Sequence, residues 1–456
     1  MNTRYSLRVY LVGAVAARAG DEMSGPALML AGFALTGSTT DASSLLAAIT
    51  ISAATGGPLL GTLLDRARRP GRLLAGALVL YAAGLWVILG GLGRCPFAVT
   101  ILIAVLTGMP APALSGGWTA QLPRVVPDDG LPRANTLDAM TYGAASLAGP
   151  VLAGATAELL GAPAAVVVSA GLIGLALPTA LMLPARPARE HVLRKASAIS
   201  DLIAGIRVVV RRPPLARATL TSVVSCVAQG MLTACTVFLG EDVLGGAGRG
   251  AMLLSCAAVS ALAANAVLAR FPHQLAPDTI IWASALVQAA ALGLAASEQP
   301  VLLVVAVLAL GIGEGPQLAA LFAVRHREAP EHLRGQIFTT GASLKTTGFA
   351  LGAAAAGPVA TWSLRGALVL AAMVAVLAAL TFFAIPSTAG NSSEDRATSH
   401  RSSPDEGTAD ALACAPGDPS LKGWRDGGQT SEAPHSYERP NKRPNERPNE
   451  RPNERP

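Results

Sequence analysis

The sequence predicts an all-α integral membrane protein, with about twelve transmembrane helices in two six-helix, pseudo-symmetric bundles. Three observations support this fold class. Hydrophobic residues make up 51% of the chain and charged residues only 14%, whereas soluble domains carry about 25% charged residues. Apolar runs of roughly 17–25 residues, long enough to cross a bilayer, recur along the chain. A basic connection divides these runs into six and six.

The chain order gives an N-terminal bundle within 1–183, a cytoplasmic linker at 184–214 and a C-terminal bundle within 215–386. Aromatic residues are only 4% of the chain, so small residues supply much of the apolar mass, as in closely packed membrane helices. The expected helices are 9–34, 42–64, 72–93, 97–119, 135–160, 163–183, 215–240, 250–269, 279–297, 300–322, 335–360 and 364–385.

Two segments outside these runs have their own character. The middle of the linker, roughly 197–210, predicts either an amphipathic helix on the inner membrane surface or a solvated basic linker. Residues 387–456 are rich in Ser, Asp, Gly and Pro and end in repeats of RPNE. Because such a composition buries few apolar groups, we expect a disordered cytoplasmic tail there.

The arginines predict the orientation. With a cytoplasmic N-terminus, the inner connections hold clusters at 66–72, 124–133, 186–217 and 325–334, whereas the outer connections hold only Arg94, Arg249 and Arg365. Lys and Arg favour the cytoplasmic side, so both termini are expected in the cytoplasm and the protein in the plasma (inner) membrane. The first apolar run has no cleavage site after a short core, so we expect it to be retained as a helix.

Other function classes find little support in the residues. The five cysteines form no CxxC pair and have no His partner at metal spacing, so neither a metal nor a cofactor is expected. The net charge of +6 comes from the loops and tail, which argues against a nucleic-acid partner. No Ser/His arrangement and no phosphate-binding Gly loop is evident, so the protein is not expected to be an enzyme.

The most specific motif is GTLLDRARRPGRLL, between the second and third runs. It resembles the cytoplasmic signature of the major facilitator superfamily, through Gly61, Asp65, Arg66 and Arg69. The motif departs from that pattern at Arg68 and Pro70. The resemblance implies two bundles that rock around a central cavity and give access to each side of the membrane in turn.

Physical reasoning gives this motif the role of an inner gate. Gly61 permits close helix contact, and Asp65 can pair with Arg while facing the positive N-terminal end of a neighbouring helix. A basic anchor with an incidental Asp is the other interpretation. In the second half, Asn265 and Ala269 stand where Gly61 and Asp65 do, so that copy has lost its acid.

The fifth run contains AASLAGPVLAG. Through Gly149, Pro150 and Gly154 it resembles, in depleted form, the Gly-Pro motif of the family's drug–proton antiporters. Ordinary packing of small residues explains the same letters. The loop at 131–140 also resembles bacterial drug and small-molecule efflux members, and its Asp138 is expected to be a structural acid. The family's fourth-helix Arg motif is not evident.

The first apolar run carries three ionisable residues, Arg18, Asp21 and Glu22. Such residues are costly within a membrane and usually face a cavity or one another. On a helix Arg18 can reach either acid, which would leave one carboxyl over as a proton carrier. Gly20, Gly25 and Pro26 would allow a local break in the helix, as at many transporter sites.

The second half repeats this arrangement with Glu314, flanked by two glycines and Pro316, and with Lys345 in the next helix. Glu314 is therefore a candidate cation or proton site, with Lys345 as its partner. Structural ion pairs between helices are the alternative for all five residues.

Together these features predict a secondary active transporter, with proton-coupled efflux of a small apolar or cationic compound. Import of a sugar or an organic acid, and a transporter-like membrane sensor that moves nothing, are the alternatives. The expected partners are the substrate, protons and the lipid bilayer, and we expect a monomer.

Overall fold

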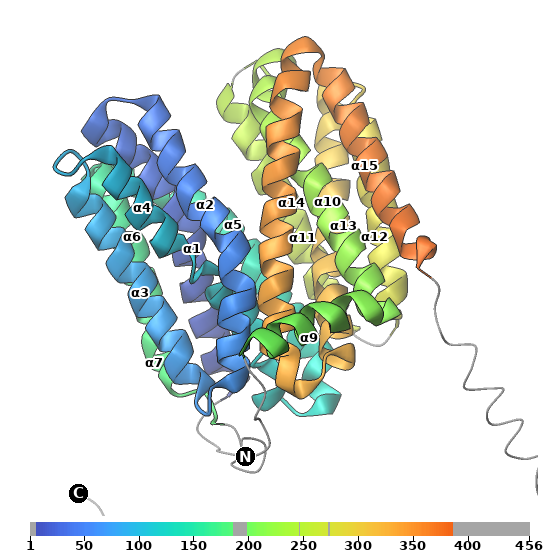
Figure 1. The fold of residues 1–456 in the computed structure, drawn as a ribbon. Helices are drawn as coiled ribbons and strands as arrows, with labels where there is room; N and C mark the ends of the chain where they lie inside the picture. Colours follow the sequence, from blue (N-terminus) through green and yellow to red (C-terminus); the bar gives the residue numbers. More distant parts are fainter. Residues whose placement is uncertain (1–5, 186–197, 246, 272–273, 386–456) are drawn as a thin grey trace, which may run out of the picture. The chain divides into compact units, whose positions relative to one another are not determined.

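The computed structural model describes residues 6–185, 198–245, 247–271 and 274–385, and these are almost entirely helical (Figure 1). The tail at 387–456 and residues 186–197 of the linker lie outside the described residues. The first half contains α1 (Leu7–Thr36), α2 (Thr39–Arg66), α3 (Pro70–Gly91), α4 (Phe97–Gly108), the π-helical turn η1 (Ala113–Gly117), α5 (Leu131–Leu160), α6 (Ala162–Leu175) and α7 (Leu177–Leu181). The second half contains α9 (Ala198–Arg211), α10 (Pro213–Phe238), α11 (Ala247–Arg270), α12 (Pro277–Ala295), α13 (Pro300–Glu328), α14 (Arg334–Trp362) and α15 (Leu364–Ala384).

Every expected membrane run corresponds to helical structure, with α4 and η1 forming one run and α6 and α7 another. Ten of these runs are long and apolar enough to cross a membrane. In the described part of the chain, α1 and α14 fall outside that group. Arg18, Asp21 and Glu22 interrupt the apolar sequence of α1, and Lys345 lies among threonines in α14. Both helices thus carry ionisable candidate residues within their apolar sequence.

Local sequence sets several helix ends. Gly37 follows α1 with φ of 70°, a conformation that glycine adopts at little cost. The Ser38 side chain accepts a hydrogen bond from the Asp41 amide at the start of α2, as N-cap residues do. Proline occupies the first turn of α3, α10, α12 and α13, where its missing N–H is not needed.

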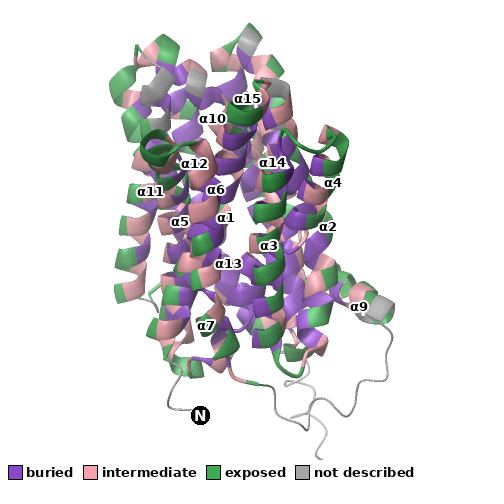
Figure 2. Ribbon diagram, turned by 90° about the vertical axis from the view of Figure 1, so that its left-hand side faces the viewer, coloured by how far each residue is buried: buried purple, intermediate pink, exposed green. Residues whose placement is uncertain are grey.

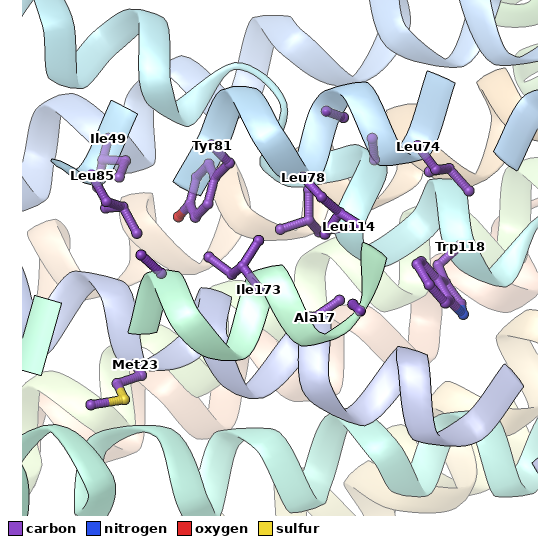
Figure 3. Close-up of a cluster of buried hydrophobic side chains, with 14 of the residues drawn as sticks. Ala17, Met23, Ile49, Leu74, Leu78, Tyr81, Leu85, Leu114, Trp118 and Ile173 are labelled. Atoms are coloured by element: carbon purple, nitrogen blue, oxygen red, sulfur yellow. The ribbon is translucent and has the colours of Figure 1, made fainter. Parts of the chain in front are cut away.

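Each half has its own apolar core. The N-terminal core packs large side chains such as Trp118, Tyr81 and Leu78 against many alanines (Figure 3). The C-terminal core is built mainly of Ala and Leu from α10 to α15. Because alanine lets helix backbones approach closely, van der Waals packing can hold these helices together without a hydrophobic driving force from the bilayer.

The flanks of the bundles also expose large apolar side chains, so the pattern is not that of a soluble protein (Figure 2). Leu159, Val79 and Trp86, for example, are all more than half exposed. Long helices with exposed apolar side chains are suited to contact with the hydrocarbon interior of a bilayer. The chain is therefore a multi-pass membrane protein.

The two halves meet mainly through α2 with α14 and through α5 with α11 and α13. We call the end of the bundles at which α9 lies the α9 end (Figure 1). The Thr339 hydroxyl donates to the Gly57 carbonyl oxygen at 2.6 Å, and the Ser343 hydroxyl donates to that of Ala53 at 2.5 Å. These bonds use the second half of α2 and the first half of α14, so they join the bundles towards the α9 end.

Within the linker, residues 198–211 form the helix α9, so a fully solvated linker is wrong for this stretch. Ala204, Val208 and Val209 pack against a core cluster of the C-terminal half. The Gln336 side chain donates to the Leu202 carbonyl oxygen at 2.7 Å. The linker helix is therefore tied to the first turn of α14, close to the junction of the bundles.

Candidate functional site

Arg18 on α1 forms its ion pair with Asp138 on α5. The Arg18 Nη1 atom lies 2.9 Å from Asp138 Oδ1, and the two side chains are 2% and 0% exposed. The expected pairing of Arg18 with Asp21 or Glu22 is therefore wrong in this structure. Side chains lean towards the N-terminus of their helix, so a cation that precedes its acid by three or four residues has the less favourable order.

Further polar groups complete the surroundings of this pair. Thr119 accepts a hydrogen bond from Arg18 Nη2 and donates one to Asp138, each at 2.8 Å. The Tyr10 hydroxyl donates to Asp138 Oδ1 at 3.0 Å. The Arg18 guanidinium also lies 3.8 Å from the centre of the Tyr142 ring. Asp138 is thus the structural acid that the sequence led us to expect, but it neutralises α1 from another helix.

Asp21 and Glu22 are consequently both left without a basic partner: no ion pair reaches either carboxyl among residues 6–185, 198–245, 247–271 and 274–385. Asp21 is half-buried and Glu22 is exposed. The Ser24 hydroxyl donates to the Asp21 backbone carbonyl oxygen at 2.6 Å and lies 2.8 Å from the Tyr81 hydroxyl on α3. The helix thus holds two adjacent carboxyls near its middle.

The α5 motif packs directly against these acids. A Cβ atom at Gly149 would lie 2.7 Å from the Cβ atom of Glu22, whereas one at Gly154 would meet nothing within 4 Å. Pro150 is exposed. Of the three motif residues, Gly149 is therefore the one that close helix contact requires.

Asp65 binds the first turn of α14 from the opposite bundle. Its two carboxylate oxygens accept hydrogen bonds from the Gly335 and Gln336 amides, both at 2.8 Å, and its side chain is only 3% exposed. A negative charge is favoured at a helix N-terminus, where backbone amides lack partners within the helix. A Cβ at Gly61 would collide with the Gln336 backbone. The structure thus has Asp65 at the N-terminus of a neighbouring helix and Gly61 in close helix contact, and their role as a gate stays a prediction.

The two arginines of the motif are placed differently. Arg66 is half-buried and Arg69 is exposed. In the second half, where Ala269 replaces the acid, an apolar cavity of about 390 Å³ lies between α5, α11, α12 and α13. Its lining includes Pro132, Leu268 and Ile280. The two pseudo-symmetric junctions thus differ in kind, since one contains a buried charge and the other an apolar space.

Glu314 on α13 and Lys345 on α14 interact electrostatically, but among the described ion pairs none within 4 Å joins them. Both side chains are half-buried. Cys226 on α10 interacts electrostatically with both Glu314 and Lys345. The acid and the base of the second half thus lie on neighbouring helices without a described ion pair, and their partnership stays a prediction.

Two polar groups of the second half are arranged in ways that the sequence did not reveal. The side chains of half-buried Gln229 and of buried Gln288 and Gln317 form a chain of hydrogen bonds at 3.2 and 3.0 Å, which continues to Ser225 at 3.1 Å. Arg325 and His326, which the sequence suggested were part of a basic loop cluster, are both buried. No local signal distinguishes them from the exposed arginines beside them.

Comparison with known proteins agrees with this architecture. A model of the Major Facilitator Superfamily matches residues 10–276. An uncharacterized MFS-type transporter, y4rN of Sinorhizobium fredii (strain NBRC 101917 / NGR234), is 31% identical over 341 residues, which cover 72% of this chain and 82% of that protein.

Solved structures show the same fold at low identity. The human organic anion transporter MFSD10 aligns with a TM-score of 0.68 and 15% identity, covering 84% of this chain and all of that one. A bacterial homologue of the iron transporter ferroportin, in an outward-facing state, gives 0.67 and 16%, with 83% and 98% covered. The transporter FucP, in the outward conformation, gives 0.64 and 15%, with 84% and 98% covered.

Proposed function

Since the chain belongs to the Major Facilitator Superfamily and is a secondary transporter, we propose that it exports a small, largely apolar compound in exchange for protons. The observation that carries this proposal is the pair of adjacent carboxyls on α1. Because Asp138 neutralises Arg18, neither Asp21 nor Glu22 is tied to a fixed positive charge. A carboxyl without such a partner can change its protonation state with its surroundings, as a proton carrier must.

The neighbours of the two acids suit this role. Tyr81 and Ser24 offer hydroxyl groups that can donate or accept hydrogen bonds, so they can accompany Asp21 in either protonation state. Gly149 brings α5 against Glu22. A proton bound here would change the charge at a contact between two helices of the N-terminal bundle. Such a change could couple proton binding to helix movement.

We assign the inner gate to Asp65, Gly61, Arg66 and Arg69, and the α9 end to the cytoplasm. The orientation rests on the arginine-rich connections at that end. The contact between Asp65 and the first turn of α14 joins the bundles only while this end is closed. Its charge would help to hold the closed state until substrate and proton movements release it, as alternating access requires.

The direction of transport rests on the resemblance of the α5 motif and of the loop at 131–140 to efflux proteins. A cationic cargo is the second candidate, because the exposed Glu22 carboxyl is available to a positive charge. A sugar importer finds less support, because Gln229, Gln288 and Gln317 already bond to one another. We place Glu314 and Lys345 beside the substrate path as a second pair of opposite charge.

Uptake into inverted membrane vesicles tests this function. The probes would be 1-naphthamide, 1-naphthoate and the cationic dye ethidium, each with and without an acidic vesicle interior. Accumulation that requires the acidic interior supports proton-coupled export. Equal uptake with and without the gradient would contradict the coupling, and the absence of movement for every probe would favour a sensor. The variant Glu158→Gln, at an exposed position of α5, is the control for loss of an unrelated acid.

A further inference from the structure

Arg325 on α13 is a buried cation without an acidic partner in the described part of the chain. Its side chain is 2% exposed, and its Nε and Nη2 atoms have no hydrogen-bond partner. The guanidinium packs against Gly341 and lies 5.7 Å from the centre of the Phe338 ring. The groups that act on it electrostatically are Tyr142 and Cys226, and neither is a carboxylate.

Two other buried or half-buried arginines have a described acidic partner. Arg18 has Asp138, and Arg217 has Asp278 at 2.8 Å. A buried charge without a counter-ion is expensive, and more so in a membrane protein. Arginine also stays protonated under all ordinary conditions, so Arg325 cannot avoid this cost by losing its proton. An anion at Arg325 in another state of the protein would account for its presence.

Residues on either side of Arg325 on α13 contact the opposite bundle towards the α9 end. His326, the next residue, bonds through Nε2 to the Thr119 carbonyl oxygen at 3.2 Å. The Tyr142 ring packs against Phe322 with ring centres 5.6 Å apart. When the bundles part at this end, these contacts are lost and Arg325 becomes accessible from the side that we assign to the cytoplasm.

We propose that Arg325 binds the anionic group of the cargo when the α9 end is open, and that the cargo is an amphipathic organic acid. Phe322 and Phe338 provide apolar walls beside the guanidinium. A guanidinium group binds a carboxylate through two parallel hydrogen bonds. Lys345, the predicted partner of Glu314, lies one turn beyond Gly341 on the same face of α14, so Arg325 supplies the charge that Glu314 does not offset. This proposal rests on the transport function and specifies its cargo.

Binding to the purified full-length protein in detergent tests it. The probes are 1-naphthoate, its neutral analogue 1-naphthamide and the cation 1-naphthylmethylammonium. The thermal unfolding midpoint is measured at increasing concentrations of each probe, and its rise gives a Kd. We expect the native protein to prefer naphthoate over naphthamide by at least about tenfold, the scale of one charged contact. Asp65→Asn should tighten naphthoate binding, because it enlarges the fraction of protein open at the α9 end.

Arg325→Gln should remove the preference for naphthoate, Arg325→Lys should keep part of it, and the control Arg217→Gln should keep all of it. Without ligand, Arg325→Gln should unfold no earlier than the native protein, because it removes an uncompensated charge. A preference that survives in Arg325→Gln, tighter binding of the ammonium probe, or no stabilisation of the native protein and Asp65→Asn by any probe would overturn the proposal. These measurements use no pH gradient, so their failure would leave the coupling role of Asp21 and Glu22 intact.

Discussion

Arg18 on α1 and Asp138 on α5 are joined by an ion pair of 2.9 Å that is closed to solvent, although two acids follow Arg18 on its own helix. This single relationship divides the charges of the N-terminal bundle into two classes. Arg18 and Asp138 form a fixed, neutral unit. Asp21 and Glu22 are left outside it, without a basic partner among the described residues, and the account of function depends on that division.

The first prediction concerns the stability of this unit. Asp138→Asn should lower the free energy of unfolding by about 3–5 kcal/mol, because it leaves the Arg18 charge buried without a partner. Equilibrium unfolding in SDS would measure the change. Glu158→Gln, at an exposed position of the same helix, is the control, and its loss should cost no more than about 0.5 kcal/mol. Similar losses in both variants would argue against a buried pair.

Asp65→Asn should open the α9 end more often. The variant loses the negative charge that faces the first turn of α14, an interaction of about 0.3–2 kcal/mol, or roughly a 2- to 30-fold change in the open fraction. The measurement is maleimide labelling of a cysteine introduced by Ala53→Cys, in a chain whose native cysteines are replaced by serine. Asp41→Asn, in the first turn of α2, is the control. Equal labelling of all three proteins would contradict the gate.

Glycine contacts give a prediction with internal controls. Gly149→Ala should reduce transport, because the added methyl group would meet Glu22, and Gly61→Ala should do so by forcing α14 away. Gly154→Ala and Gly76→Ala add the same methyl group in open space. They should leave transport unchanged and stabilise their helices by about 0.5–1 kcal/mol. Loss of transport in the second pair as well would mean that helix flexibility, rather than close contact, is required.

Glu314 and Lys345 should stabilise the fold as a pair, and transport should require both side chains. Each single variant, Glu314→Gln or Lys345→Gln, leaves the opposite charge without compensation, so both should unfold earlier than the native protein. The double variant should regain most of that stability and still fail to transport. A double variant that transports normally would make the pair purely structural, and a thermal unfolding series alongside vesicle uptake distinguishes the two results.

The helices could be predicted because their signal is local. Runs of apolar residues with proline at their starts define α3, α12 and α13 within the sequence itself. Asp65 was also accessible to prediction, because its motif places an acid at a helix end beside arginines. The identity of its partner, the first turn of α14, came only with the structure.

The charge pairs show where sequence reasoning ends. Arg18 has acids three and four residues away, yet its partner is 120 residues away in the chain, because helix packing determines which side chains meet. Arg325 shows the same limit: it lies among Arg327 and Arg334 in the sequence, but its side chain turns inward against Gly341. Neither outcome leaves a local pattern, since each depends on which helix lies opposite.

The central claim is that Asp21 and Glu22 carry the protons. The most direct test compares the native protein with the double variant Asp21→Asn/Glu22→Gln in proteoliposomes, using whichever of the three vesicle probes accumulates. Both accumulation driven by a pH gradient and exchange of labelled for unlabelled probe without a gradient would be measured. We predict that the double variant loses accumulation and keeps exchange. Accumulation that persists in the double variant would contradict the account.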